Sequence, residues 1–292
     1  MRIVAYKQGG KTKVGNLAKD GQTITPFALG GNAAEQGALA VMDLVLAGKT
    51  PEAESGTVKL SDVELLAPIP KPRRNVFCVG KNYFDHAHEF AKSGFDSSAA
   101  AGAVPDVPII FSKVPESVIA SGQKILFDPK VSTAIDYEVE LALVIGKGGR
   151  GISKADALNH VWGYTIINDV TARDVQGRHK QWLLGKSFDT FCPMGPALVT
   201  ADELGHGPFE VRCWVNGEQR QKASTDLLIF DIPTLIECIS SGITLIPGDI
   251  ISTGTPAGVG IGFTPPKYLK AGDVVRQEIP GIGVIENTLA EI

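Results

Sequence analysis

The sequence lacks the long hydrophobic runs and the excess of one charge that mark several large classes of protein. No stretch of about 18 apolar residues occurs, so no transmembrane helix is expected. Residues 1–7 have neither the apolar core nor the cleavage site of a signal peptide. The net charge of −4 gives no sign of a nucleic-acid or anionic-membrane surface. These absences predict a cytoplasmic protein that acts on a small molecule, with no nucleic acid and no membrane as a partner.

Cysteine is also scarce. The four cysteines lie far apart without a CxxC pair, which favours reduced, buried thiols over disulfides or a metal cluster. Glycine and proline, in contrast, supply 33 and 18 of the 292 residues. Such a composition predicts many turns and short strands and argues against a helical bundle.

The chain divides, by prediction, at a proline-rich and basic connector. Residues 1–70 are expected to form a small β-rich domain, with a strand at 2–6, a turn at 9–11 and a helix over 33–46. Pro70-Lys71-Pro72-Arg73-Arg74 follows, and residues 71–292 are expected to form the catalytic domain.

Apolar patterning predicts the elements of this second part. Strands are expected at 75–80, at 136–145 as one long element, and at 161–169, and an Asn-Gly hairpin is expected at 216–217. Helices are expected after Ser153, from residue 170, and over 232–241. The segment 92–108 is rich in Ala, Ser, Gly and Asp and is expected to be mobile at the surface.

Three carboxylates stand where they would be costly to bury without a counter-charge. Glu138 and Glu140 are two apart on the predicted strand, so they share a face beside the apolar run 141–145. Asp169 ends the next apolar strand. Three carboxylates suit a hard divalent cation such as Mg²⁺, with Mn²⁺ or Ca²⁺ as alternatives. The other interpretation is a solvated strand face, on which Glu-x-Glu alternation is common.

Other polar residues gather around these acids in the sequence. Arg173 and Gln176 would share a helical face, and Arg173 with Lys186 could hold a carboxylate or stabilise an oxyanion. His86 and Glu89 are three apart, which lets a carboxylate orient an imidazole as a general base. Taken singly, each of these residues could equally be an ordinary surface or structural side chain.

A glycine pattern gives a competing hypothesis. Residues 146–151 match the G-x-G-x-x-G fingerprint of dinucleotide sites, and Asp169 follows at the spacing of a ribose-binding acid. That fingerprint must itself open a helix, whereas the predicted helix begins only after Ser153. A tight turn is the preferred interpretation.

Together, five ordered motifs resemble those of the fumarylacetoacetate hydrolase family over about residues 72–292. They are Asn82-Tyr83-x-Asp85-His86-x-x-Glu89, Asp136-Tyr137-Glu138-Val139-Glu140-Leu141, Asn168-Asp169-Val170-Thr171-Ala172-Arg173-Asp174-Val175-Gln176, Gly185-Lys186-Ser187-Phe188-Asp189 and Gly254-Thr255-Pro256-x-Gly258-Val259-Gly260. The resemblance implies a mainly β (α+β) fold, a mixed β-sandwich roll behind a small N-terminal domain, paired as a homodimer.

The resemblance also implies a role for each candidate residue. Glu138, Glu140 and Asp169 match the family's metal ligands, and His86 and Glu89 its water-activating dyad, carried on a lid. Lys186 matches the active-site lysine, Arg173 and Gln176 the substrate-contacting pair, and Thr255 the residue that binds the substrate carboxylate. Val79 stands where some members have a fourth acidic ligand.

The activity expected is Mg²⁺-dependent hydrolysis of a C–C bond in a 2,4-dioxo acid, which yields a 2-oxo acid and a carboxylate. The same site chemistry also serves oxaloacetate-type decarboxylation and the isomerisation of a 2-hydroxy-diene-dioate. A non-catalytic, metal-dependent binder of small molecules is the alternative from another class.

Overall fold

The computed structural model describes residues 1–92 and 104–292. Most of the segment 92–108, predicted to be mobile, lies outside the described residues. None of the described helices is both long enough and apolar enough to cross a membrane.

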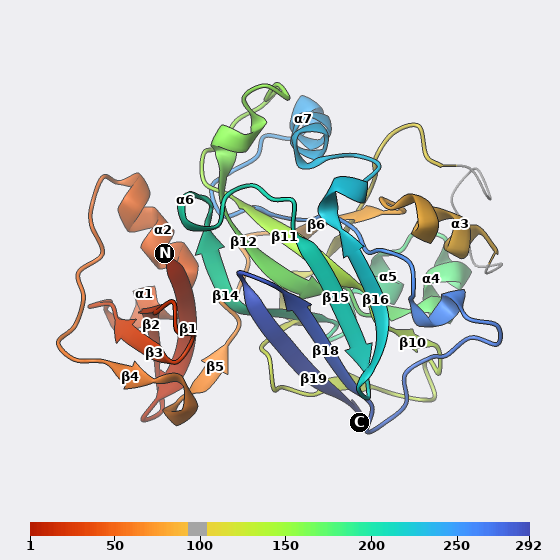
Figure 1. Cartoon of the computed structure of the whole chain (residues 1–292), viewed down its shortest axis with the longest axis horizontal. Coiled ribbons are helices and arrows are strands. Elements are labelled where there is room, and N and C mark those ends of the chain that lie inside the picture. The colour runs from red at the N-terminus through yellow and green to blue at the C-terminus, as the bar shows by residue number, and fades with distance from the viewer. Residues whose placement is uncertain (93–103) are drawn as a thin grey trace.

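The largest sheet in the described part of the chain has 12 strands. Its path is β4-β3-β2-β1-β14-β12-β11-β17-β6-β7, with β5 on β1 and β8 on β14 (Figure 1). The members are β1 (Arg2–Gln8), β2 (Lys11–Leu17), β3 (Thr23–Pro26), β4 (Val58–Lys59), β5 (Glu64–Leu66), β6 (Val76–Gly80), β7 (Ile109–Lys113), β8 (Val118–Ile119), β11 (Val139–Ile145), β12 (Val161–Asn168), β14 (Cys192–Thr200) and β17 (Ile250–Ser252).

A second sheet of five strands, counted over the same residues, packs against the first. Its order is β16-β15-β18-β19-β9, from β9 (Ile125–Phe127), β15 (Glu210–Val215), β16 (Glu218–Ser224), β18 (Val274–Ile279) and β19 (Gly283–Glu291). Leu141 and Leu143 from the first sheet share one buried cluster with Val211 and Val275 from the second. Both sheets mix strand directions, since β17 runs parallel to β6 and β9 parallel to β19. The predicted mainly β fold with a mixed sandwich is confirmed.

Short helices lie around the sheets. They are α1 (Gly31–Ala34), α2 (Ala38–Leu46), α3 (Phe84–Lys92), α4 (Arg173–His179), α5 (Leu183–Lys186), α6 (Ala201–Leu204) and α7 (Ile232–Gly242), with 3₁₀ turns η1 (Leu60–Asp62), η2 (Pro115–Ser117), η3 (Ala157–His160), η4 (Thr225–Leu227) and η5 (Gly260–Gly262). α3, α4 and α5 gather at the right of Figure 1. A small sheet of β10 (Ile135–Asp136) and β13 (Thr171–Ala172) precedes α4.

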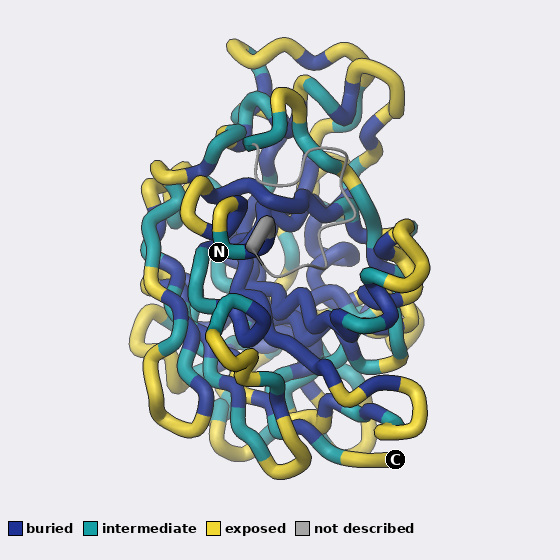
Figure 2. The backbone as a smooth tube through the Cα atoms, turned by 90° about the vertical axis from the view of Figure 1, so that its right-hand side faces the viewer, coloured by how far each residue is buried: buried dark blue, intermediate teal, exposed yellow. Residues whose placement is uncertain are grey.

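The N-terminal strands continue the sheet of the rest of the chain. β1 pairs with β14 through Arg2↔Val199 and Ile3↔Leu198, and Ile3 shares a buried cluster with Val144. The division at residue 70 stays a prediction, but the two parts are joined by a sheet and a core. Buried backbone accordingly fills the centre of Figure 2, with exposed turns around it.

Three sequence-based elements differ from the structure. The helix expected over 33–46 is broken at Gly37, whose φ is 60° and whose Cβ would lie 2.3 Å from the carbonyl oxygen of Pro68. The strand expected at 136–145 is interrupted at Tyr137 and Glu138, because the Glu138 N–H donates to the Asn168 side chain, 3.0 Å away, instead of to a strand. After Ser153 only the 3₁₀ turn η3 forms.

Other sequence-based expectations are confirmed. The hairpins at Gly9-Gly10 and at Asn216-Gly217 join β1 to β2 and β15 to β16. All four cysteines are free thiols, and three of them are buried. The glycines at 146–151 form a turn after β11 and open no α-helix.

Candidate metal centre and active-site cavity

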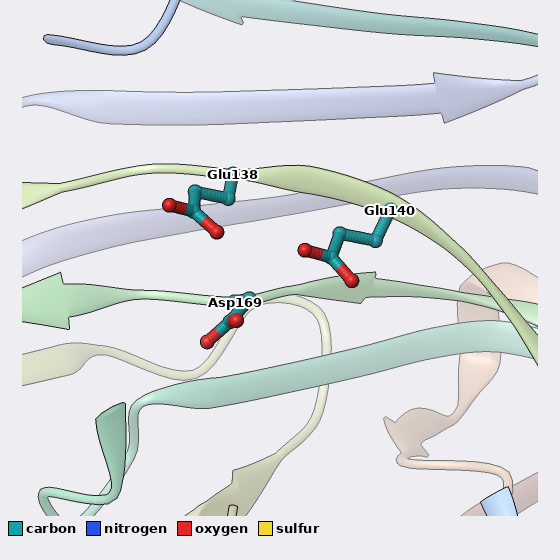
Figure 3. A group of neighbouring side chains, drawn as sticks. All are labelled: Glu138, Glu140 and Asp169. Carbon is teal, nitrogen blue, oxygen red and sulfur yellow. The ribbon is translucent and has the colours of Figure 1, made fainter. Parts of the chain in front are cut away.

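Three buried carboxylates meet where β11 and β12 run side by side. Glu138 precedes β11, Glu140 lies within it, and Asp169 directly follows β12. One oxygen from each lies within 4.8 Å of the others, and none of the three residues is more than 4% exposed. Figure 3 shows Glu138 and Glu140 projecting from one ribbon toward Asp169 on the next. The predicted convergence of these three acids is confirmed.

Buried cations surround this acidic triad. Lys186 Nζ lies 2.8 Å from both Glu138 Oε2 and Asp169 Oδ2. Lys113 Nζ lies 2.7 Å from Asp169 Oδ1. Arg173 Nη2 lies 2.6 Å from Glu138 Oε1. Two of the three carboxylates are therefore compensated by protein charges.

Glu140 is the exception. Its Oε2 accepts hydrogen bonds from Ser252 Oγ at 2.6 Å and from Gly254 N at 3.0 Å, and both donors are uncharged. Burial, together with the nearby carboxylates of Asp169 and Glu138, raises the pKa of Glu140 well above its usual range. For Glu138 burial acts in the same direction, but Lys186 and Arg173 outweigh it and hold that pKa low. Glu140 is thus the member of the triad that forms no ion pair among the described residues, and its ionised form is the one that a bound cation would favour.

A divalent cation fits this donor set. All three ligands offer carboxylate oxygen, the type that Mg²⁺, Mn²⁺ and Ca²⁺ prefer. A cation among them would also remove the repulsion that raises the pKa of Glu140. Glu138, Glu140 and Asp169 are the residues that would hold it.

The cavity beside the triad is small and closely lined. It encloses about 270 Å³ including its open mouth, and its walls come from β6, α3, α4, α5 and the loop after β17. The lining includes five of the sequence-predicted site residues besides Glu138: His86, Arg173, Gln176, Lys186 and Thr255. The cationic and hydroxyl groups in this lining suit an anionic ligand such as an organic acid.

Two of these residues offer donors to a ligand. Arg173 donates from Nε to Asp136 Oδ2 at 2.9 Å and from Nη1 to Gln176 Oε1 at 3.2 Å. Its Nη2 is ion-paired with Glu138 Oε1 at 2.6 Å, but it is not aligned for a regular hydrogen bond with a described residue. Thr255 Oγ1 accepts from Gln221 Nε2 at 2.8 Å, which leaves the hydroxyl hydrogen free to be donated.

The predicted dyad lies on α3, the helix that covers the cavity. His86 Nδ1 is 3.3 Å from Glu89 Oε2, and His86 is 5% exposed. Phe90 from the same helix packs with Trp182, Val259 and Ile261. Since Nδ1 faces Glu89, Nε2 is the nitrogen left to exchange a proton with a ligand.

Glu89 is docked onto a glycine-rich loop. Both of its oxygens accept from Gly258 N, at 3.1 and 3.2 Å. A Cβ on Gly262 would lie 1.9 Å from Glu89 Oε1, and one on Gly258 would lie 1.9 Å from the carbonyl oxygen of Arg220. The close approach of Glu89 on α3 therefore requires glycine at 262, and the close approach of β16 requires it at 258.

Sequence reasoning missed several residues of the site. Lys113 is fully buried, and besides Asp169 it contacts the carbonyl oxygens of Val170 and Lys186. Gln221 bridges Thr255 to the backbone N–H of Val139. A usable signal existed for Lys113, because it ends an apolar strand just as Asp169 does. No local signal marked Gln221.

Comparison with known proteins identifies the family. The model of the fumarylacetoacetate (FAA) hydrolase C-terminal domain matches residues 75–290. The chain belongs to this family. A protein named oxaloacetate tautomerase YisK, from Bacillus subtilis, is 49% identical over 244 residues, which cover 82% of this chain and 78% of that protein.

Solved structures of this family match the whole chain. The fumarylacetoacetate hydrolase of Exiguobacterium antarcticum has a TM-score of 0.83 at 39% identity, with all of both chains covered. A 5-carboxymethyl-2-hydroxymuconate delta-isomerase from Mycobacterium smegmatis has a TM-score of 0.78 at 33% identity, again with full coverage of both. This chain is therefore an enzyme, which sets aside the alternative of a non-catalytic binder.

Proposed function

We propose that this enzyme is a Mg²⁺-dependent catalyst for 2-oxo acids that interconverts the keto and enol forms of an oxaloacetate-type substrate. The observation that carries the proposal is the cavity, which Glu138 of the acidic triad lines together with the Arg173 guanidinium, the Lys186 ammonium and the Thr255 hydroxyl. The name of the B. subtilis relative points to the same reaction.

The cation and the basic side chains have separate tasks in this proposal. A divalent ion held by Glu138, Glu140 and Asp169 would act as a Lewis acid on the 2-oxo group. Arg173 Nη2 and the Thr255 hydroxyl bind the substrate carboxylate, and Gln176 keeps Arg173 in place.

His86 is assigned as the base because Lys186 is unsuited to that role. Burial would lower the pKa of Lys186, but Asp169 and Glu138 outweigh burial and raise it, so Lys186 stays an ammonium. It stabilises negative charge on the 2-oxo oxygen. His86 Nε2, oriented by Glu89, takes a proton from C3 of the keto form. The C–H electron pair becomes the C2–C3 double bond, and the 2-oxo oxygen gains a proton to give the enol.

Hydrolysis of a 2,4-dioxo acid is the second candidate, and the docked dyad favours it. In support of this candidate, His86 lines the cavity and lies 3.3 Å from Glu89, and an imidazole oriented by a carboxylate can deprotonate water. Attack of that water would form a C–O bond at C4, and collapse of the adduct would break the C3–C4 bond, so that C4 leaves as a carboxylate and C3 takes up the proton from His86 to give the 2-oxo acid. Decarboxylation and diene-dioate isomerisation would use the same cation and anion-binding groups.

One set of assays separates these reactions. The enzyme with Mg²⁺ is mixed with enol oxaloacetate, and the loss of enol absorbance is followed by product analysis. Faster ketonisation with oxaloacetate recovered intact supports the tautomerase, whereas pyruvate and CO₂ indicate a decarboxylase. Acetylpyruvate split into pyruvate and acetate would make the enzyme a hydrolase. If none of these substrates turns over, the proposed substrate class is wrong.

We also propose a homodimer, a cytoplasmic location and Mg²⁺ as the working metal, on the strength of the family resemblance and the sequence. Light scattering during gel filtration tests the dimer. Activity restored to EDTA-treated enzyme by Mg²⁺, Mn²⁺ or Ca²⁺ at matched concentrations tests the metal.

A further inference from the structure

One buried carboxylate joins the cavity wall to the loop on which α3 docks. Asp136 is fully buried at the end of β10. Its Oδ1 accepts from Tyr137 N at 2.9 Å and Gly260 N at 2.6 Å. Its Oδ2 accepts from Ile261 N at 3.0 Å and Arg173 Nε at 2.9 Å. Asp136 therefore binds Arg173 and η5 at the same time.

η5 is part of the surface that receives α3. Gly258, two residues before η5, donates its N–H to Glu89. Val259 and Ile261 pack against Phe90, and Gly262 lies against the Glu89 carboxylate. A displacement of this loop would thus move the dock of Glu89 and, through Glu89, the ring of His86.

Tyr137 adds a second tether between the same two regions. Its hydroxyl donates to the carbonyl oxygen of Gly258 at 2.9 Å. The loop that binds Glu89 is therefore held at residues 258, 260 and 261 by residues 136–137, which directly precede Glu138.

We propose that Asp136 is a positioning residue that couples Arg173 in the cavity wall to the docked state of α3. Its four acceptor contacts fix Arg173 Nε and the N–H groups of Gly260 and Ile261 in one arrangement. A substrate carboxylate on Arg173 and a docked His86–Glu89 pair consequently favour each other, as linkage requires. The activity part of this proposal rests on the proposed function, and the structural part does not.

Asp136→Asn is the direct test. An amide keeps the shape but has one acceptor oxygen, so its NH₂ must face two of the four donors. Asp249→Asn is the matched control, because Asp249 is also a buried acid that accepts from an arginine, Arg74, and from a backbone N–H, that of Ile246. None of these three residues lines the cavity.

Hydrogen exchange on the metal-free protein provides a readout without activity. Asp136→Asn should speed exchange in α3 and residues 258–262 by about tenfold or more, with α7 unchanged as the internal reference. Asp249→Asn should leave α3 and residues 258–262 as in the wild type. The same exchange pattern in both variants would overturn the proposal, whatever the enzyme's substrate proves to be.

Kinetics supply the second readout. Asp136→Asn should raise KM and lower kcat together, because it disturbs both Arg173 and the dock of the base. In the double variant with Glu89→Gln, kcat/KM should fall by a smaller factor than the product of the factors for the two single variants. The difference should be more than about threefold. Multiplicative losses would contradict the coupling. If Asp136→Asn does not fold, Tyr137→Phe tests the other tether, and it should speed exchange in the same segments to a smaller extent.

Discussion

The floor and the cover of the active-site cavity are held in place by different means. The floor carries Glu138, Glu140 and Asp169 on neighbouring strands, where ladder hydrogen bonds and four buried ionic contacts fix them. The cover is α3, a helix of nine residues that docks through Glu89 on Gly258 and through Phe90 in a small apolar cluster. The proposed metal binding therefore belongs to a strand-paired part of the fold that ion pairs fix, and the proposed proton transfer belongs to a short helix that docks through one carboxylate and a small apolar cluster of the described residues.

The largest expected effect comes from the floor. Glu140→Gln keeps acceptor contacts with Ser252 and Gly254 and breaks no ion pair. It removes one of three anionic ligands, so kcat should fall by at least ~10³-fold, the several kcal/mol of a Lewis acid. Calorimetric titration with Mg²⁺ should show binding lost or greatly weakened.

Asp249→Asn controls for the loss of a buried carboxylate, and it should retain Mg²⁺ binding. Tight Mg²⁺ binding by Glu140→Gln would mean that the acidic triad is not the metal site. The floor of the cavity would then no longer be the metal-binding region.

The second effect comes from the cover. His86→Ala removes the proposed base but no metal ligand, so kcat should fall by about 10²–10⁴-fold while Mg²⁺ affinity stays unchanged. Initial rates at saturating substrate check the fall in kcat, and a Mg²⁺ titration checks the affinity for the metal. Full ketonisation activity in this variant would exclude His86 as the base.

A smaller loss of activity is expected when α3 is displaced but keeps His86. In Gly262→Ala the new methyl group would lie 1.9 Å from Glu89 Oε1, so Glu89 must leave its dock. Gly262 has no positive φ, so the backbone accepts alanine and the effect is steric. Misplacement of a catalytic group by about 1 Å can cost on the order of 10²-fold, and we expect a fall in kcat/KM toward that size.

Gly242→Ala is the matched control, since a Cβ there meets nothing within 4 Å. It should keep the wild-type kcat/KM. Equal activity of the two alanine variants would show that the dock of Glu89 does not matter for the reaction.

The floor was also far more predictable from sequence than its connections to the cover. Glu138, Glu140 and Asp169 stand next to apolar strands, where an acid must be compensated, and the polar residues around them in the sequence favoured a shared site over an exposed strand face. Asp136 carries no such signal, because its donor Gly260 is 124 positions away and donates through the backbone. The break at Glu138 was equally hidden, since the side chain of Asn168 replaces a ladder partner of its N–H.

The cover was predictable only as a motif. His86 and Glu89 were paired by their spacing on a helix, and the structure places them 3.3 Å apart. That Glu89 would be held by Gly258 and need Gly262 could not be inferred, since both depend on how the loop after β17 folds back. Backbone contacts between distant segments leave no trace in composition or periodicity.

The smallest expected effect concerns stability, and it isolates the floor from catalysis. In EDTA-treated protein the pKa of Glu140 is raised by burial and by Asp169 and Glu138. An acid whose folded pKa is raised contributes its stability fully below the unfolded value near 4.5, and loses it as pH rises through the folded pKa. The Tm of the metal-free wild type should therefore fall relative to that of Glu140→Gln as the pH rises above the usual range of a glutamate. Mg²⁺ at 100 times its Kd should raise the free energy of unfolding of the wild type by roughly 2.7 kcal/mol, and so raise its Tm. The Glu140→Gln variant should show no such rise. A Tm difference that stays constant as the pH rises would mean that Glu140 remains ionised without metal, because other groups in the floor then compensate its charge.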